Sequence, residues 1–148
     1  MDFKNTIIIM TSNLGAEYAF ESDPEARKEH YLNAVHKFFK PELINRIDEI
    51  IVFNALGKDV QKQIADKFLG ILANRLAQKD IHLEVTDKAK DRIVACGVDP
   101  QFGARPMRRH IQREIETEVA KVVLANPDIA GKTIKVDADD SKYLVSVH

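Results

Sequence analysis

The stretch IHLEVTD at residues 81–87 decides much of the predicted fold, because two kinds of structure meet within it. Apolar and polar residues alternate strictly over residues 81–85, a pattern typical of a strand with one buried face. Thr86 and Asp87 then offer side chains that cap helices, so we expect a helix to begin there and to end at Gly97. The stretch therefore predicts a strand followed directly by a helix.

Amphipathic helices are predicted on both sides of this stretch. Residues 59–79 form one long candidate, and a second runs from Pro106, in its first turn, to about Leu124. Apolar residues recur every four positions in each and mark the predicted buried stripes: Val60, Ile64, Phe68, Leu72 and Leu76 in the first, Met107, Ile111, Ile115 and Val119 in the second.

Two short β-branched segments follow the second helix. Residues 133–136 and 143–147, separated by the turn-forming residues 137–141, predict a hairpin that extends the sheet begun at residues 81–85. Residues 56–148 are thus expected to form a small α+β domain, in which helices pack on a short three-stranded sheet.

Residues 1–55 have a different pattern, typical of the α/β class. The apolar run TIIIM at residues 6–10 predicts a strand buried on both faces, and residues 50–53 predict a second one. Residues 25–39 between them are predicted to form a helix. A sheet of only two strands covered by one helix is marginally stable, so we expect this βαβ-like unit to be an incomplete part of a larger domain.

Composition argues against several functional classes. The chain carries 22 basic and 23 acidic residues, and this near balance gives no general electrostatic reason to expect a nucleic-acid partner. No apolar run reaches the roughly 18 residues of a membrane span and no signal-peptide pattern opens the sequence, so we expect a soluble, cytoplasmic protein without membrane contacts. Cys96 is the only cysteine and the five histidines never fall at i, i+4, so no metal site is predicted.

One feature contradicts a local rule of helix formation. Arg105, Arg108 and Arg109 crowd the first turn of a predicted helix, where the helix dipole favours acids. A nearby anion such as phosphate would use both the arginines and the free N–H groups of the turn. The alternative is that the arginines simply reach solvent or pair with Glu114 and Glu116.

The backbone distinguishes Arg105 from the other two arginines. Gly103 and Ala104 precede it and Pro106 follows it, so Arg105 is expected at a tight junction between a loop and a helix. The sequence nevertheless contains no GxxxxGK[ST] loop to cradle the β- and γ-phosphates. We therefore expect that this chain alone does not hydrolyse ATP.

Two polar residues within residues 1–55 are further candidates. Asn13 follows the first predicted strand, at the carboxyl end where open α/β sheets bind ligands, although asparagine also forms turns and helix caps at such places. Arg46 lies between Glu42 and the acids Asp48 and Glu49, where an arginine most often forms an ion pair.

Three stretches together resemble the second ATPase module of ClpB-type AAA+ unfoldases: DFKNTIIIMTSNLG at residues 2–15, FKPELINRIDE at residues 39–49 and FGARPMRR at residues 102–109. The three stretches occur in the order expected for that module, and the resemblance covers nearly the whole chain. The resemblance implies that residues 1–55 are the C-terminal part of an AAA+ large, nucleotide-binding domain and that residues 56–148 are the small C-terminal domain. It also implies that such proteins continue upstream of Met1.

The same resemblance implies roles for the candidate residues. Asn13 resembles sensor 1, which orients the attacking water, and Arg46 resembles the arginine finger, which acts on the nucleotide of a neighbouring subunit. Arg105, preceded by Gly103 and Ala104, resembles sensor 2, which contacts the phosphates. Ile64 resembles a position that packs against adenine, although a core isoleucine is the commoner interpretation.

The family implies a homo-hexameric ring that uses ATP or ADP with Mg²⁺ and acts on unfolded or aggregated proteins. We expect the chain by itself to bind no nucleotide tightly. Three alternatives stay open: the same region of a ClpA- or ClpC-type subunit that feeds a protease, a stand-alone protein-interaction domain, and a nucleic-acid-binding module. The last would use Arg105, Arg108, Arg109 and Arg113, and the near-neutral charge argues against it.

Overall fold

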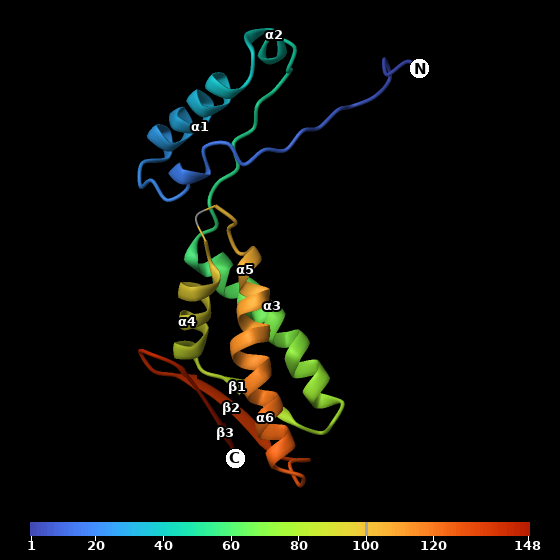
Figure 1. The fold of residues 1–148 in the computed structure, drawn as a ribbon, viewed down its shortest axis with the longest axis vertical. Coiled ribbons are helices and arrows are strands. Elements are labelled where there is room, and N and C mark those ends of the chain that lie inside the picture. Colours follow the sequence, from blue (N-terminus) through green and yellow to red (C-terminus); the bar gives the residue numbers. More distant parts are fainter. Residues whose placement is uncertain (100) are drawn as a thin grey trace. The chain divides into compact units, whose positions relative to one another are not determined.

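The computed structural model describes residues 1–99 and 101–148, which divide into two compact units (Figure 1). Unit 1 comprises Met1–Ala55 and unit 2 comprises Leu56–His148. Each unit has its own arrangement of elements, and almost all of the buried core belongs to unit 2.

Unit 2 is an α+β domain with a three-stranded mixed sheet, as the sequence predicts. Its elements in order are α3 (Lys58–Ala77), β1 (His82–Val85), α4 (Asp87–Gly97), α5 (Arg105–His110), the π-helix η2 (Ile111–Glu116), α6 (Thr117–Ala125), β2 (Thr133–Ala138) and β3 (Tyr143–Val147). The predicted strand, capped helix, amphipathic helices and hairpin of residues 56–148 are therefore all confirmed, with boundaries shifted by one or two residues.

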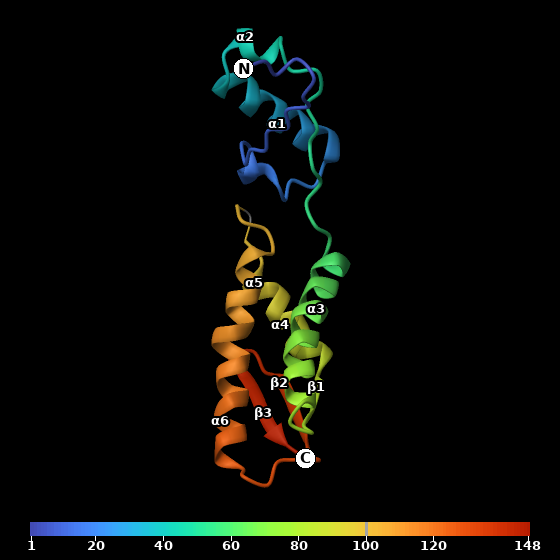
Figure 2. The same cartoon turned by 90° about the vertical axis from the view of Figure 1, so that its right-hand side faces the viewer.

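The central strand β2 organises the sheet. It pairs in parallel with β1, with His82 opposite Thr133, and antiparallel with β3, with Ile134 opposite Val147. Because side chains alternate along a strand, Ile134, Val136 and Ala138 are buried on one face. The helices of unit 2 pack against the sheet, and in the turned view β3 is seen between α6 and α3 (Figure 2).

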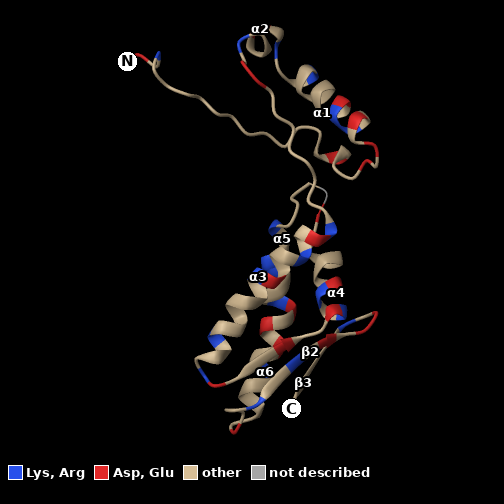
Figure 3. Ribbon diagram, turned by 180° about the vertical axis from the view of Figure 1, so that it is seen from behind, with Lys and Arg blue, Asp and Glu red and all other residues tan. Residues whose placement is uncertain are grey.

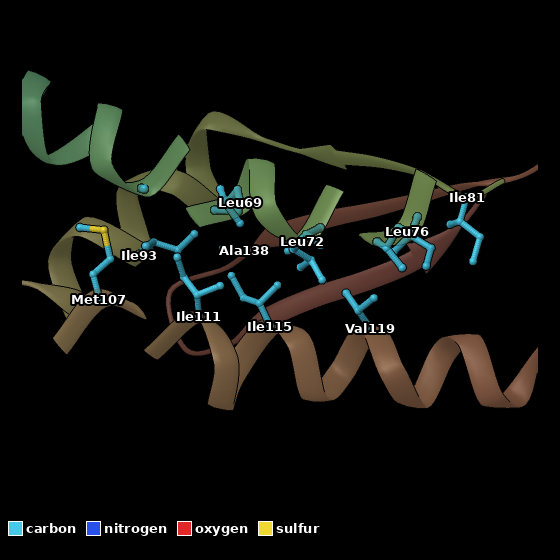
Figure 4. Close-up of a cluster of buried hydrophobic side chains, with 14 of the residues drawn as sticks. Leu69, Leu72, Leu76, Ile81, Ile93, Met107, Ile111, Ile115, Val119 and Ala138 are labelled. Atoms are coloured by element: carbon cyan, nitrogen blue, oxygen red, sulfur yellow. The ribbon is translucent and has the colours of Figure 1, made fainter. Parts of the chain in front are cut away.

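A continuous helical run, α5–η2–α6, supplies one side of the core. Met107, Ile111, Ile115 and Val119 are at most 2% exposed, which confirms the predicted stripe. A strict spacing of four residues overshoots one face of an α-helix by about 40° at each step. The wider π-turn of η2 takes up this drift, so Ile111, Ile115 and Val119 line the side of the core opposite Leu69, Leu72 and Leu76, and Met107 lies next to Ile93 (Figure 4).

The buried stripe of α3 corrects the prediction made from spacing. Its buried residues are Gln61, Ala65, Leu69, Leu72 and Leu76, whereas Val60 is 42% exposed and Ile64 and Phe68 are half-buried. This helix has no π-turn, so a stripe that repeats only every four residues would wind around it. The observed stripe includes one step of three residues, which keeps it facing the core.

Unit 1 contains η1 (Ala16–Tyr18), α1 (Pro24–Phe38) and α2 (Pro41–Ile44). The predicted helix over residues 25–39 is confirmed, and the Asp23 side chain caps it by accepting a hydrogen bond from the Glu25 amide at 3.1 Å.

The structure corrects the two predicted strands of residues 1–55. Neither residues 6–10 nor residues 50–53 form a strand, and Ile7, Ile8 and Ile9 are 91%, 76% and 83% exposed. A strand exists only through hydrogen bonds to a neighbouring strand, and these two segments do not pair with each other. The βαβ-like unit is thus reduced to its helix.

Candidate functional site

The loop before α5 is shaped by one aspartate and one glycine. Asp99 and Gly103 exchange backbone hydrogen bonds of 2.9 and 2.7 Å, and the Asp99 carboxylate accepts from the amides of Gln101 and Phe102 at 2.8 and 3.0 Å. Gly103 has a φ of +62°, a left-handed conformation that side chains disfavour. Gly103 is therefore required by the turn that delivers the chain into α5.

The turn places Arg105 at the first position of α5, next to the cap residue Ala104. The side chains of Arg105, Arg108 and Arg109 are exposed, and within the described residues none forms an ion pair or a side-chain hydrogen bond. The ribbon of α5 is marked by basic residues, drawn blue in Figure 3. Glu116 pairs instead with Arg75 at 3.7 Å. The start of α5 is thus a cluster of uncompensated cations that suits an anionic ligand.

Two contacts that help to hold α5 on the rest of unit 2 lie at its two ends. The first is the packing of Met107, which is fully buried, against Gly97 at the end of α4; a Cβ atom on Gly97 would lie 2.9 Å from the Met107 Cα atom. The second is at the other end of α5, where His110 Nε2 lies 2.6 Å from the Tyr143 hydroxyl of β3.

Arg92 of α4 completes a cluster around Tyr143. Its guanidinium lies 5.3 Å from the centre of the Tyr143 ring and donates to the carbonyls of Asp140 and Ser141 at 3.2 and 2.6 Å. Burial lowers the pKa of His110 and raises the pKa of Tyr143. Sequence reasoning missed this cluster, because its members are far apart in the chain and follow no local pattern.

Ile64 lies on α3, half-buried against the hydrophobic core. Helices α3 and α5 contact each other, so Ile64 and Arg105 belong to neighbouring elements of one unit. The nearby Gln61, another residue that the sequence did not single out, is buried and donates to the Leu56 carbonyl at 2.7 Å.

The other two candidates lie in unit 1. The side chain of Asn13 is exposed, and the backbone carbonyl of Asn13 accepts a hydrogen bond from the Ala16 amide at 3.1 Å in a turn that leads into η1. Arg46 follows α2 and is exposed, and no carboxylate of the described residues lies within ion-pair distance of it. The ion-pair interpretation of Arg46 is therefore not supported, and no hydrogen bond joins Asn13 to Arg46 in the described part.

Residues 1–99 and 101–148 contain no cluster of three or more acidic, histidine or cysteine side chains that could hold a metal ion. No helix in that part of the chain combines the length and the apolar character needed to cross a bilayer.

Each of the two units matches a known protein family. Residues 56–136 match a family described as the C-terminal, D2-small domain of ClpB protein, and residues 1–50 match the AAA domain of the Cdc48 subfamily. The chain is 43% identical to the chaperone protein ClpB of Clostridium perfringens, over 99% of this chain and 17% of that protein. It is 42% identical to ClpB of Vibrio cholerae, over 99% of this chain and 18% of that protein.

A relative with another name matches to a similar extent. The ATP-dependent Clp protease ATP-binding subunit ClpC of Staphylococcus saprophyticus is 38% identical, over 97% of this chain and 19% of that protein. The chain thus spans less than one fifth of the length of these relatives.

Proposed function

This chain belongs to the ClpB family, as the C-terminal part of its second ATPase module, and from that premise we propose that it serves an ATP-dependent protein unfoldase. In this proposal the chain supplies nucleotide-sensing residues and subunit contacts to a cytoplasmic homo-hexamer. The ring remodels unfolded or aggregated proteins. A ClpC-type assignment, in which the ring feeds a protease, has no observation that favours it over the ClpB-type assignment.

The uncompensated arginines at the start of α5 carry this proposal. A guanidinium presents a planar set of N–H donors that matches phosphate oxygens, and the arginines of α5 have no acidic partner in the described part of the chain. We assign Arg105 to the phosphates, as sensor 2, with Gly103 and Ala104 shaping the backbone that presents it. Ile64, only half-buried, keeps apolar surface that can contact adenine.

The bound nucleotide, with Mg²⁺, supplies the phosphoryl group that is transferred to water. Asn13 is proposed to orient that water, and Arg46 to stabilise the charge that develops on the phosphoryl group in a neighbouring subunit. Both side chains are exposed, and neither is engaged by other side chains in the described part, so both are available to a ligand.

The exposed apolar segments of unit 1 also support the proposal. Ile7, Ile8, Ile9 and Met10 form an extended run, and such a run is stable in water only when neighbouring strands and helices cover it. We propose that residues 6–10 and 50–53 take their places in the sheet of a complete AAA+ large domain.

The test uses the complete ATPase module that contains this chain. Arg105→Ala is expected to weaken nucleotide binding, measured by fluorescence titration, and Arg46→Ala is expected to abolish hydrolysis while nucleotide binding stays normal. Arg113→Ala is the matched control, because it removes an exposed arginine two turns further along the same helical run. Normal binding and normal turnover in the first two variants would overturn the assignments.

A further inference from the structure

The helix that presents Arg105 is short and is followed at once by a π-helical turn. Hydrogen bonding in a π-turn differs from that of the flanking α-helices, so η2 is a natural place for α5 to change its direction relative to α6. The orientation of α5 is then set by the contacts that α5 itself makes. Two of these are the packing of Met107 on Gly97 and the hydrogen bond of His110 to Tyr143.

These two contacts differ in kind. The Gly97–Met107 contact is a fixed apolar packing in the core. The His110–Tyr143 contact is a hydrogen bond of 2.6 Å between two polar, half-buried side chains. One of the two partners is an imidazole, which can gain a proton. Tyr143 is held in turn by Arg92, which covers its ring and ties α4 to the hairpin turn through the Asp140 and Ser141 carbonyls.

We propose that His110 and Tyr143 are positioning residues that set the direction of α5, and through it of Arg105, and that protonation of His110 loosens this setting. The inference rests on the proposed function only for the role of Arg105. The contact itself and its sensitivity to protonation are properties of unit 2.

The charges around His110 explain the sensitivity to protons. The charged and titratable groups that act on it are Arg92 of α4, Arg113 and Glu114 of η2 and its partner Tyr143 of β3, and Cys96 of α4 acts in turn on Tyr143. Burial disfavours an imidazolium here, Arg92 and Arg113 repel it, and Glu114 offsets part of that repulsion. A proton on His110 thus places a poorly solvated cation between α5 and β3.

The first experiment measures amide hydrogen exchange of the whole chain by NMR. Tyr143→Phe keeps the ring under Arg92 but removes the hydroxyl, and it is expected to raise the exchange of the Met107–Ile111 amides by about fivefold relative to those of β1 and β2. Ser146→Ala, which removes an exposed hydroxyl from the same strand, is the control and leaves α5 unchanged. An unchanged α5, or an increase spread evenly over unit 2, would overturn the inference.

A conservative variant separates positioning from packing. His110→Gln can still form a hydrogen bond to Tyr143 but cannot titrate. The α5 amides of this variant are therefore expected to have the same exchange protection as the wild type at pH 7.5, and to retain that protection at pH 5.5. The wild type is expected to lose protection in α5 over the same interval, after correction for intrinsic exchange. Equal behaviour of the two proteins at pH 5.5 would contradict the role of the proton.

The last arm uses the complete ATPase module. Tyr143→Phe is expected to weaken nucleotide binding in the same direction as Arg105→Ala but by a smaller factor. Weak binding in Arg105→Ala beside normal binding in Tyr143→Phe would overturn the positioning role alone. Normal binding in Arg105→Ala would overturn the proposed function, and the exchange measurements would still decide whether His110 and Tyr143 fix α5.

Discussion

The hydroxyl of Thr86 donates a hydrogen bond to the carboxylate of Asp137 at 2.8 Å, although the two residues are 51 positions apart. The same hydroxyl oxygen accepts a hydrogen bond from the Ala89 amide at 3.2 Å and so caps α4. One side chain thus joins the start of a helix to the central strand of the sheet. The hydrogen bond from Thr86 also lowers the pKa of Asp137.

Replacing Thr86 should destabilise unit 2 at both of these connections. Thr86→Ala is expected to lower the free energy of unfolding by about 1–2 kcal/mol, since it removes a helix cap and the donor to Asp137. Urea denaturation followed by circular dichroism measures the change. Thr86→Ser retains the hydroxyl and is expected to lose much less; an equal loss in both variants would mean that the methyl group, not the hydroxyl, matters.

The space around Gly97 and Gly70 differs, and this difference predicts opposite effects on stability when each is replaced by alanine. Gly97→Ala would place a Cβ atom 2.9 Å from the Met107 backbone and is expected to cost about 1–3 kcal/mol of stability. Gly70→Ala in the middle of α3 meets no atom within 4 Å and is expected to add about 0.5–1 kcal/mol. Thermal unfolding of the two variants beside the wild type checks both signs.

The buried imidazole predicts how stability depends on pH. The pKa of His110 in the folded protein lies below its ordinary value of 6.5, so the unfolded chain binds the proton more tightly. The contribution of His110 to the free energy of unfolding is complete above pH 6.5, and it is lost as the pH falls from 6.5 through the pKa of His110 in the folded protein. Urea denaturation between pH 5 and 8 should show this fall in the wild type.

Two substitutions separate His110 from the other titrating groups. His110→Gln is expected to flatten the pH dependence of the unfolding free energy near pH 6. His82→Gln, which removes an exposed histidine of β1 in the same unit, should leave it as steep as in the wild type. The prediction fails if the two variants have the same slope.

The uncovered segment of unit 1 predicts self-association of the isolated chain. Residues Ile7–Met10 are between 59% and 91% exposed and extended, so copies of the chain can pair through them. Sedimentation velocity should show a concentration-dependent increase in mass that Ile8→Lys abolishes. Ile71→Lys changes a singly exposed isoleucine of α3 and should not abolish it, because isolated apolar residues at a surface do not drive pairing.

Local patterns carried most of the prediction for unit 2. The alternation before Thr86, the cap at Thr86 and the stripe from Met107 to Val119 each depend on residues close together in sequence, and the structure contains all three elements. The predicted buried stripe of α3 is wrong at three positions, because apolar residues every four positions stay on one face only where the helix contains a π-turn. In a regular α-helix the same spacing winds around the helix. Only packing against the other elements distinguishes the two.

Features that depend on distant contacts could not be predicted. The run at residues 6–10 has the composition of a buried strand, but composition supplies no partner, and none of the described residues pairs with it. His110 and Tyr143 are 33 positions apart and form no motif, so their hydrogen bond becomes visible only in the fold. The roles of Asn13, Arg46 and Arg105 came from resemblance, and remain predictions to be tested.

The mixed pairing of the sheet has a consequence for biosynthesis. β2 and β3 are joined by a short turn and can pair as soon as both have been made, whereas β1 must wait while α4 and the whole α5–η2–α6 run are synthesised. During translation β1 and the inner face of α4 therefore stay without their strand partner until residues 133–138 have left the ribosome. We expect this interval to be the one in which the nascent domain depends most on protection from aggregation.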